Sequence, residues 1–440
     1  MTVPAVTLRA LSRFRCIADA CEDSCCRGWR VNLRHDDLER IPAAVRSRVH
    51  LSVVAPTDTL AAGHDGGTAS GDGACGHVRL RDDGSCSLLA EDGLCELQRD
   101  HGASCLPAVC ALYPRVVRQY GDRLEASALI SCPEYARQLL LAADGATLEA
   151  FDPEQLPRQL AVDMSLERAG PYGRHFDDVR GAMLAVLDAR RFGAAQRLFL
   201  LAFFAHRTRS FFHRGVGSEV DVADELRDQI GLITRAGAQS AIAAQQRGVP
   251  PSAQTGLAFV CDLLATAGRS NTTARFRTLV HEATQTYSEP PQHVGDPSST
   301  TRSAQVVMWE KYRRRRSTIC GTAQAPLDGA MLNRATDYVF STPYVEADDL
   351  MQYVQRLLIE LAVVRFLFFS QPTLDVIVDP RDQSMAPSLQ RALIAENIVT
   401  VFSATHRCMH HDKRFSDSLF DLLGTYNLDS LAGCLFLLEI

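Results

Sequence analysis

The stretch that organises this chain reads FRCIADACEDSCCRGW and spans residues 14–29. Four cysteines fall within eleven residues of it, and Cys25 and Cys26 are adjacent. A core would use Leu or Val at such positions, so clustered thiols indicate a site where sulfur is needed as a ligand or nucleophile. If residues 19–26 are helical, Cys21 and Cys25 share one face while Cys26 points elsewhere. Such a face can offer two thiolates to one metal centre.

The first third of the chain supplies more thiols, since ten of the fourteen cysteines lie before residue 133. Those that follow the opening stretch are Cys75, Cys86, Cys95, Cys105, Cys110 and Cys132. The remaining four, Cys261, Cys320, Cys408 and Cys434, stand in apolar or helical contexts, and we expect them to be small buried hydrophobic side chains.

The compartment decides how these thiols are interpreted. Residues 1–15 contain no apolar run of signal-peptide length, so we expect a cytoplasmic protein with reduced cysteines. Clustered thiols in a reducing compartment are more typical of metal or redox chemistry than of disulfides.

Composition excludes other classes of partner. The 440 residues carry a formal net charge of −6, so we expect no binding to nucleic acid or to anionic membranes. The most apolar segment, residues 357–369, is too short to span a bilayer and contains Glu360 and Arg365. The basic run at residues 311–316 favours a solvated helix face over a docking site for an acidic protein.

The cysteine-rich part alternates short strands with tight turns. Residues 29–33 read as extended and lead into a polar helix that begins near Asp36. Residues 77–81 and 85–89 flank a turn, which predicts a β-hairpin, and a second turn at 91–93 precedes Cys95. The hairpin therefore places Cys86 and Cys95 on either side of a tight turn, as metal-binding ribbons often do.

The end of the cysteine-rich part is also predicted from local signals. Pro107 and Pro114 bracket Cys110, which places that thiol on one turn of helix or on a rigid loop. A strand over residues 124–130 runs into Cys132, and a helix follows.

Beyond residue 151 the apolar spacing becomes helical. The predicted helices are 176–190, 194–213, 221–247, 252–267, 271–287, 303–316, 332–340, 347–370, 389–407 and 416–423. We therefore expect an α+β protein whose cysteine-rich metal-binding N-terminal module contains a β-hairpin and precedes a mainly α-helical body. The expected division is a module at 1–145, helical parts at 146–288 and 302–440, and a linker or long loop at 289–301 between them.

Four separated motifs in the first third resemble the flagellin lysine-N-methylase family of bacteria, and more loosely small proteins with an adjacent-cysteine metal-chelating module. They are Phe14-x-Cys16-x4-Cys21-x3-Cys25-Cys26-x-Gly28-Trp29, Cys86-x8-Cys95 with its Asp92-Gly93 turn, Cys110-x2-Tyr113-Pro114-Arg115, and Ser131-Cys132-Pro133-Glu134. The resemblance covers residues 12–136, whereas the helical body matches in length and character alone. This chain has Ser87 where the family often has Pro.

The resemblance implies an S-adenosylmethionine-dependent protein-lysine N-methyltransferase that acts on flagellin and carries a 4Fe-4S cluster. Carried over position by position, the metal-ligand candidates are Cys16, Cys21, Cys25, Cys26, Cys86, Cys95, Cys110 and Cys132. Cys75 and Cys105 fall outside the family's pattern.

Eight thiols exceed the needs of one centre, because four fill a 4Fe-4S cluster and four fill a zinc site. A cluster with a zinc ion, or a cluster with structural thiols, would each account for the number. The common radical S-adenosylmethionine spacing, Cys-x3-Cys-x2-Cys, would need a cysteine where Gly28 stands, which argues against a standard radical-generating cluster.

Methyl transfer to lysine requires loss of a proton, since an amine with a pKa of about 10.4 is protonated at neutral pH. Candidate proton acceptors beside the likely ligands are Glu134, Tyr113 and Tyr135, although each also suits a structural role. Candidate cofactor-binding residues are Trp29, through a cation–π contact with the sulfonium, and Arg115, through the methionine carboxylate. Packing is the simpler role for Trp29, and an ion pair within the fold suits Arg115 equally well.

Two other functions fit the same thiols: a zinc- or iron-chelating module without catalysis on a helical interaction domain, and an iron-sulfur oxidoreductase. A third feature, CMHHD at residues 408–412, resembles a small metal-ligand set, but we expect a helix end there.

Overall fold

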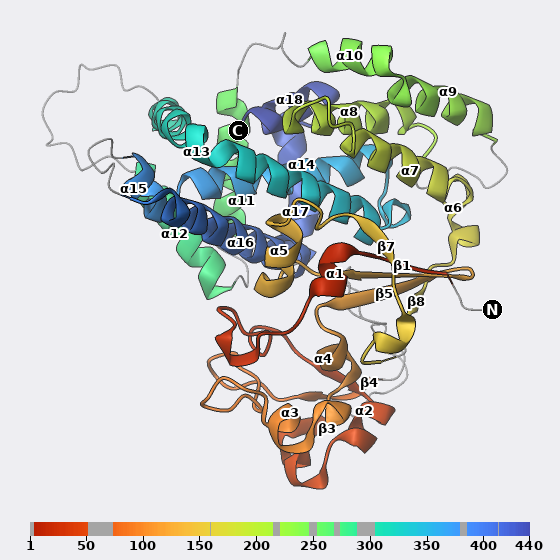
Figure 1. Ribbon diagram of the computed structural model, residues 1–440, viewed down its shortest axis with the longest axis vertical. Helices are drawn as coiled ribbons and strands as arrows, with labels where there is room; N and C mark the ends of the chain where they lie inside the picture. Colours follow the sequence, from red (N-terminus) through yellow and green to blue (C-terminus); the bar gives the residue numbers. More distant parts are fainter. Residues whose placement is uncertain are drawn as a thin grey trace, which may run out of the picture. The chain divides into compact units, whose positions relative to one another are not determined.

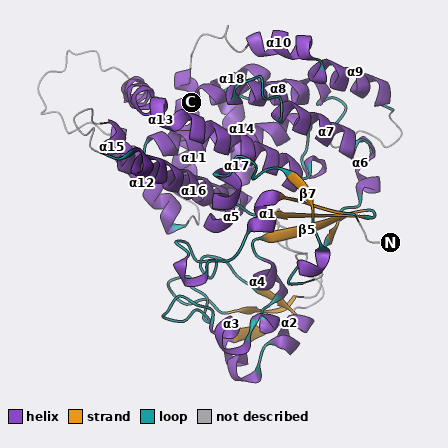
Figure 2. Ribbon diagram, viewed as in Figure 1, coloured by secondary structure: helices purple, strands orange, loops and turns teal. Residues whose placement is uncertain are grey.

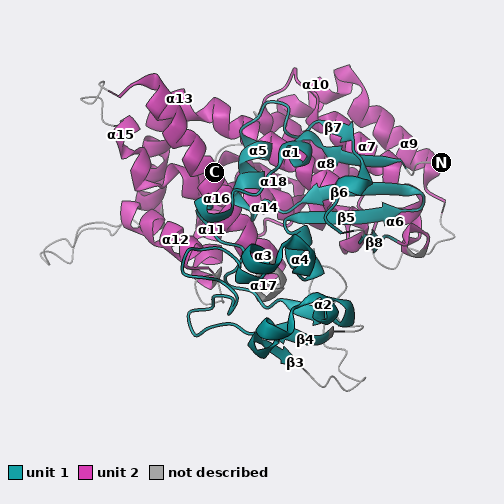
Figure 3. Cartoon of the chain, turned by 60° about the horizontal axis from the view of Figure 1, so that its bottom comes forward, with its two compact units in different colours: residues 1–164 teal, residues 165–440 magenta. Residues whose placement is uncertain are grey.

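The computed structural model describes residues 4–51, 74–158, 160–213, 221–245, 253–267, 273–287, 304–378, 385–411 and 413–440. The chain divides into two compact units, Met1–Met164 and Ser165–Ile440, which Figure 3 shows in two colours. Within the described residues, every strand belongs to the first unit and the second is helical (Figure 2). The α+β class predicted from the sequence is confirmed.

The larger sheet of the first unit has five strands in the order β7-β1-β6-β5-β8. Their bounds are β1 Ala5–Leu8, β5 Arg115–Tyr120, β6 Arg123–Ala128, β7 Leu148–Ala150 and β8 Val162–Asp163. β5 and β6 are antiparallel, β6 confirms the predicted strand over 124–130, and β1 pairs with β6 in parallel. Because β7 and β8 complete this sheet, the first unit runs to Met164 rather than to residue 145.

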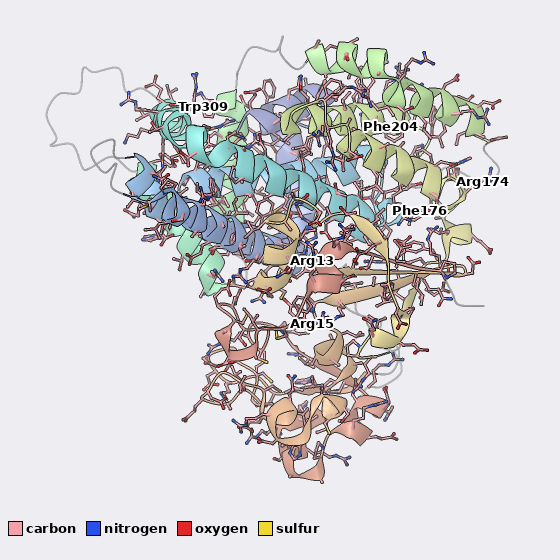
Figure 4. All side chains as sticks on the ribbon, viewed as in Figure 1. Arg13, Arg15, Arg174, Phe176, Phe204 and Trp309 are labelled. Carbon is pink, nitrogen blue, oxygen red and sulfur yellow. The ribbon has the colours of Figure 1, made fainter. Side chains whose placement is uncertain are left out.

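Two short helices of the first unit, α1 (Arg9–Arg13) and α5 (Pro133–Leu140), pack against each other beside this sheet (Figure 1). Asp144 accepts hydrogen bonds from both Arg9 and Arg13, which fixes α1 to the chain that follows α5. Arg13 and Arg15, labelled in Figure 4, lie where the chain leaves α1 for the cysteine-rich stretch.

A smaller three-stranded sheet, in the order β2-β4-β3, carries the rest of the first unit. Its strands are β2 Asn32–Arg34, β3 Val49–Leu51 and β4 Ala74–Val78, and its helices are α2 His35–Arg40, α3 Glu96–His101 and α4 Ala108–Leu112. Three 3-10 turns, Ala18–Ala20, Ala43–Arg48 and Ala103–Cys105, complete this region. The small sheet and the elements around it share one core, which consists of Val31, Leu33, Ile41, Val49, Val78, Cys86, Leu88, Leu89, Leu97 and Leu106.

The predicted hairpin forms, but with less regular pairing than the alternation suggested. The chain reverses between Arg81 and Ser85, where the Arg81 amide donates to the Ser85 carbonyl at 2.8 Å, and the Ser87 amide donates to the Arg79 carbonyl at 2.9 Å. The regular strand, β4, ends at Val78 and is the middle strand of the small sheet. The hairpin is therefore an extension of β4 rather than a separate pair of strands.

The helix considered for residues 19–26 does not form. A 3-10 turn covers only Ala18–Ala20, and turns and bends follow it. Ser24 Oγ accepts a hydrogen bond from the Cys26 amide at 3.2 Å, a local bond that competes with the helical ladder. Cys21 and Cys25 therefore do not share a helical face.

The second unit is built round α14 (Leu350–Phe369), which is buried on nearly all sides. Its helical neighbours include α8, α11, α12, α13, α16 and α18. The other helices are α6 Pro171–Arg174, α7 Phe176–Leu187, α8 Ala194–Thr208, α9 Ala223–Thr234, α10 Ala236–Gln245, α11 Ala253–Ala267, α12 Ala274–Tyr287, α13 Ala304–Ser341, α15 Asp375–Val378, α16 Pro387–His411, α17 Lys413–Thr425 and α18 Leu431–Glu439. None of the helices that the structure describes has the length and apolarity that crossing a bilayer requires.

Three predicted helices of this unit were divided wrongly. The helix predicted over 221–247 breaks at Arg235, whose backbone is extended, into α9 and α10. The helices predicted at 303–316 and 332–340 are parts of one helix, α13, which passes through Pro326. Ile319, Ala323, Leu327 and Ala330 are buried at helical spacing on either side of that proline, so packing holds the helix together where a backbone hydrogen bond is lost.

Helices from both sides of the predicted linker pack together in the second unit, as α11 with α13 and α12 with α16 show. The linker itself, at 289–301, lies outside the described residues. The helical parts predicted at 146–288 and 302–440 therefore belong, from Ser165 onward, to one compact unit.

The basic run at residues 311–316 is not simply a solvated face. Arg315 donates to the carbonyls of Phe369 and Gln371, at the end of α14. Arg316 donates to the carbonyl of Ile440, just beyond α18. These arginines therefore supply partners to carbonyls that a helix end leaves without a bond inside the helix.

Candidate thiol site

Five of the predicted ligand cysteines line one cavity of about 70 Å³ in the first unit: Cys25, Cys26, Cys86, Cys95 and Cys110. The rings of Trp29 and Tyr113 and several aliphatic side chains complete its walls. All fourteen cysteines of the chain are free thiols. The cavity is therefore mainly an apolar space with sulfur at several points of its wall.

Backbone pairing sets Cys26 beside Cys86. The Cys86 amide donates to the Cys26 carbonyl at 2.8 Å, and the Gly28 amide donates to the Gly84 carbonyl at 3.0 Å. Gly28 and Gly84 have φ angles of 82° and 75°, a conformation that favours glycine. The two glycines thus let the cysteine-rich stretch and the hairpin turn run side by side.

The turn at 91–93 brings Cys95 back toward the same cavity, as predicted. The Ala90 amide donates to the Leu94 carbonyl at 2.8 Å, and the Glu96 amide donates to the Leu88 carbonyl at 2.8 Å. Asp92 stabilises the turn by accepting from the Leu94 amide. Cys95 then stands at the N-cap of α3.

The fourth segment is α4, a single short helix between Pro107 and Pro114 as the sequence predicted, and it carries Cys110. Asp37, only 3% exposed, accepts from the Ala108 amide at 2.8 Å and from the Arg34 amide at 3.0 Å. One buried carboxylate therefore holds the start of α4 against the start of α2. This contact fixes the helix on which Cys110 sits.

The surroundings of Cys26, Cys86, Cys95 and Cys110 keep these thiols protonated unless a cation binds. Burial raises the pKa of Cys86 to about 11 and that of Cys110 well above its usual value. Negative charge on Cys26 or Cys95 would raise the pKa of Cys86 and that of Cys110 further. Four thiolates cannot coexist here unless a cation compensates them, which is what a metal ion or an iron-sulfur cluster does.

The other three predicted ligands lie apart from the cavity wall. Burial raises the pKa of Cys132 to about 12, and charge on Cys21 or Cys16 would raise it further, so these three thiols are neighbours. Cys132 is the N-cap of α5. The structure thus divides the eight predicted ligands into five at the cavity and three beside α5.

The two spare cysteines do not line the cavity. The Cys75 thiol donates to the Leu33 carbonyl and the Cys105 thiol to the His101 carbonyl, each at hydrogen-bond range for sulfur. Both therefore serve the local fold, in keeping with their position outside the motif.

The spacing of the sulfurs bears on which centre they fit. In the described residues, one group of three or more His, Cys, Asp or Glu side chains has all its ligand atoms within 4.8 Å of one another, and its members are Glu360, His406 and His410. The thiols of the cavity form no such group in the part of the chain that the structure describes. Four sulfurs on one zinc ion lie about 3.8 Å apart, because each Zn–S bond is about 2.3 Å and the geometry is tetrahedral. The thiols therefore do not close round a single ion, whereas a cubic cluster holds its four ligand sulfurs further apart.

The three candidate proton acceptors have different surroundings. The Glu134 carboxylate accepts from Arg137 at 2.5 Å and from Gln138 at 2.7 Å. Tyr135 is fully buried, with its ring edge-on to Phe14. Tyr113 lines the cavity, and its hydroxyl lies 3.2 Å from Ser131 Oγ. Only Tyr113 of the three lies on the cavity wall.

The two candidate cofactor-binding residues also separate. Trp29 lines the cavity, its ring centroid is 6.1 Å from that of Tyr113, and its indole N–H donates to the Cys25 carbonyl. The Arg115 guanidinium lies 5.0 Å from the centroid of the Phe14 ring. Burial and the charge of Arg15 lower its pKa, and in the described part of the chain no carboxylate forms an ion pair with it.

A second cluster of ligand-type side chains, in the second unit, was missed from the sequence. Glu360 of α14 meets His406 and His410 of α16, with Arg334 of α13 beside them. The CMHHD motif does end a helix, as predicted, but His410 contacts Glu360 rather than simply facing the helix end. His406 and His410 are four residues apart, a spacing that places two side chains on one helix face, but the helix predicted at 389–407 ended before His410, whereas α16 continues to His411.

Comparison with known proteins supports the kinship that the cysteine motifs suggested. Residues 180–437, more than half of the chain and all within the second unit, match the family model for the FliB lysine N-methylase C-terminal domain. The lysine-N-methylase of Salmonella typhimurium is 28% identical over 139 residues, which is 31% of this chain and 33% of that protein. The flagellar biosynthetic protein FliU of Salmonella muenchen is 27% identical over 139 residues, which is 31% of this chain and 78% of that protein.

The alignment with the Salmonella typhimurium protein thus spans about a third of either chain. No solved structure matches. The family model carries the assignment, because it covers the larger part of the sequence and fits the helical unit that the structure describes. The resemblance seen in the cysteine motifs and the match of the helical body agree: this chain belongs to the FliB lysine N-methylase family.

Proposed function

We propose that this protein is an S-adenosylmethionine-dependent methyltransferase that modifies lysine side chains of flagellin in the cytoplasm and carries a 4Fe-4S cluster. The observation that carries the proposal is the family match over residues 180–437, joined to a set of thiols round one cavity in the first unit. The names of two relatives, a lysine-N-methylase and a flagellar biosynthetic protein, support the substrate class.

Cys26, Cys86, Cys95 and Cys110 are our ligands for the cluster, with Cys25 as the further thiol on the same wall. They come from four separate segments, each fixed by its own backbone hydrogen bonds or by Asp37. Their spread round a cavity suits a cube better than a single zinc ion. When bound, the cluster would supply positive charge and a redox-active centre to an otherwise apolar pocket.

The methyl transfer itself makes one bond and breaks one. The lysine Nζ lone pair attacks the methyl carbon of the sulfonium, the sulfur–carbon bond breaks, and S-adenosylhomocysteine leaves. A proton must first leave the ammonium group. We assign Tyr113 to receive or relay that proton, because it lines the cavity and its hydroxyl lies 3.2 Å from Ser131 Oγ. Glu134, held by Arg137 and Gln138, and the buried Tyr135 stabilise α5 in this proposal.

Cofactor binding is assigned to two residues, each for its own reason. Trp29 offers an aromatic face at the cavity, where a sulfonium cation would be attracted to the ring. Arg115 is a half-buried cation without a carboxylate partner among the described residues, so it is available to the carboxylate of the cofactor's methionine group.

The test is an assay with anaerobically purified protein, flagellin and S-adenosylmethionine that carries a deuterated methyl group. We expect broad absorption at about 400 nm, four irons per chain, and labelled lysines in the flagellin mass spectrum. The variant Cys110→Ser loses iron and labelling, whereas the matched control Cys105→Ser keeps both.

Each rival function predicts a different result. A non-catalytic chelating module gives no label, with zinc and no colour or with iron alone. An oxidoreductase gives a reversible redox couple and no label. Unlabelled flagellin with an intact, iron-loaded protein would reject the methylase proposal.

A further inference from the structure

We propose that Glu360, His406 and His410 form a binding site for a divalent first-row transition ion such as Zn²⁺ or Fe²⁺, separate from the thiol cavity. Their ligand atoms all lie within 4.8 Å of one another, a property that no other group of His, Cys, Asp or Glu shares in the described part of the chain. The three residues belong to the second unit, so the inference does not depend on the proposed function of the thiols.

The helices bring the three ligands together without help from loops. His406 and His410 are one turn apart on α16, and their rings stack with centroids 4.1 Å apart. Glu360 lies in the middle of α14, which packs along α16. The site is thus carried by two rigid helices, the kind of support that keeps ligand positions precise.

The distances leave only a small adjustment for an ion. His410 Nε2 lies 2.9 Å from Glu360 Oε2, and His406 Nδ1 lies 3.7 Å from Glu360 Oε1. Ligands bound at about 2.1 Å in tetrahedral geometry lie about 3.4 Å apart. The two histidine–carboxylate distances lie on either side of that value, and all the ligand atoms lie within 4.8 Å of one another. Two imidazoles and one carboxylate form the ligand set that suits iron or zinc and leaves coordination positions open.

The protonation pattern is compatible with ligation. The guanidinium of Arg334 can only donate, so the 3.2 Å contact between its Nη2 and His406 Nδ1 makes Nδ1 an acceptor with a lone pair. An ion would take the Nδ1 lone pair, and Arg334 would keep its bonds to the carboxylates.

The surrounding charges do not exclude a cation. Arg334 donates to both oxygens of Glu360 and also to Asp337, so two carboxylates face this one guanidinium. Arg356, the next cation along α14, lies with its guanidinium over the Phe420 ring. Glu360 and Arg334 are almost completely buried, whereas the His410 side chain is 17% exposed. An ion would reach the site, and a substrate or water its open positions, on the His410 side.

The test uses full-length protein without a polyhistidine tag, stripped with a chelator and titrated with Co²⁺. Cobalt at this site gives weak visible bands without the intense near-ultraviolet bands of cobalt–thiolate bonds, which separates it from metal at the cysteines. We expect His410→Ala to bind one Co²⁺ fewer per chain than the wild type. The matched control His281→Ala, an exposed histidine of α12, keeps the wild-type count.

A second measurement guards against a folding defect in the alanine variant. His410→Gln retains a hydrogen-bonding group beside Glu360 but no imidazole, and it also should lose one Co²⁺. Saturating Zn²⁺ should raise the melting temperature of the second unit in the wild type and leave that of His410→Gln unchanged. Equal cobalt counts in the wild type and His410→Gln would contradict the metal site, and so would wild-type spectra with thiolate bands alone. The three residues would then serve with Arg334 as a buried network of ion pairs and hydrogen bonds.

Discussion

The thiol cavity of the first unit and the Glu360 cluster of the second are held by different kinds of backbone. The cavity thiols come from a turn, a hairpin, an N-cap and a one-turn helix, with Asp37 holding the start of this helix. The Glu360 cluster comes from the middle or last turns of helices 20 to 38 residues long. The first arrangement therefore depends on local contacts and on whatever it binds, whereas the second is rigid before anything binds.

The largest expected effect comes from removing thiols of the cavity in the first unit. The double variant Cys26→Ser with Cys110→Ser removes two of the four proposed ligands, so we expect complete loss of cluster iron and of methyl transfer. Limited proteolysis should then cut the first unit quickly while the second unit keeps its helical circular dichroism. The double variant Cys75→Ser with Cys105→Ser is the control. Full iron content in the first variant would contradict the ligand assignment.

The next largest effect is expected from a change in the Glu360 cluster of the second unit. Glu360→Gln leaves the buried Arg334 with Asp337 as its one charged partner among the residues that the structure describes, and we expect a loss of about 3–5 kcal/mol in the free energy of unfolding. Urea denaturation followed by circular dichroism measures it. In the control Asp375→Asn, the carboxylate side chain is 60% exposed, so the loss should be at most about 1 kcal/mol. Equal losses in the two variants would show that burial does not distinguish these ion pairs.

A third prediction sharpens the contrast at Asp37. Asp37→Asn weakens two buried hydrogen bonds to backbone amides, and we expect about 2 kcal/mol of destabilisation in the first unit, with faster loss of iron. Hydrogen exchange of α2 and α4 reports the loosening. The neighbouring Asp36 is exposed, so Asp36→Asn should change stability by only a few tenths of a kcal/mol. Unchanged exchange in α4 would count against the role of Asp37.

The smallest effect concerns pH and the second unit. Burial raises the pKa of Cys434 from 9.0 to about 12, so the folded state keeps this proton after the unfolded chain has lost it. The stability contributed by this thiol is complete below pH 9 and is lost as the pH rises from 9 towards 12, by up to about 1.4 kcal/mol per pH unit. Cys434→Ala should reduce that slope, whereas Cys320→Ala, whose thiol is half-buried, serves as the control. Urea titrations at several pH values measure how the free energy of unfolding depends on pH. The same dependence in Cys434→Ala and in the wild type would contradict the role of this thiol.

Local signals explain why the sequence predicted much of the thiol site. The Asp92-Gly93 turn, the prolines that bracket Cys110, and Pro133 after Cys132 each act within a few residues, and each has the predicted result. The division of the ligands into two groups was not predicted, because it depends on the pairing of Gly28 with Gly84 and on where β6 delivers Cys132. The helix at 19–26 failed for a local reason, the Ser24 bond.

Long-range contacts explain what the sequence missed. The parallel pairing of β1 with β6 joins residues far apart in the chain, and no local pattern specifies it. Apolar spacing located the helices of the body well. The predicted boundaries were wrong around Pro326, which lies inside α13, and at Arg235, where α9 ends. The meeting of Glu360 with His406 and His410 was missed, because it depends on the packing of α14 against α16.

The position of Trp29 on the cavity wall has a practical consequence for spectroscopy. The chain contains two tryptophans, Trp29 in the first unit and Trp309 on α13 of the second, where Figure 4 labels it. In a Trp309→Phe background, indole emission would come from Trp29 alone. Loading of the cavity with a coloured inorganic group should then quench that emission, which gives an optical record of cofactor insertion in real time.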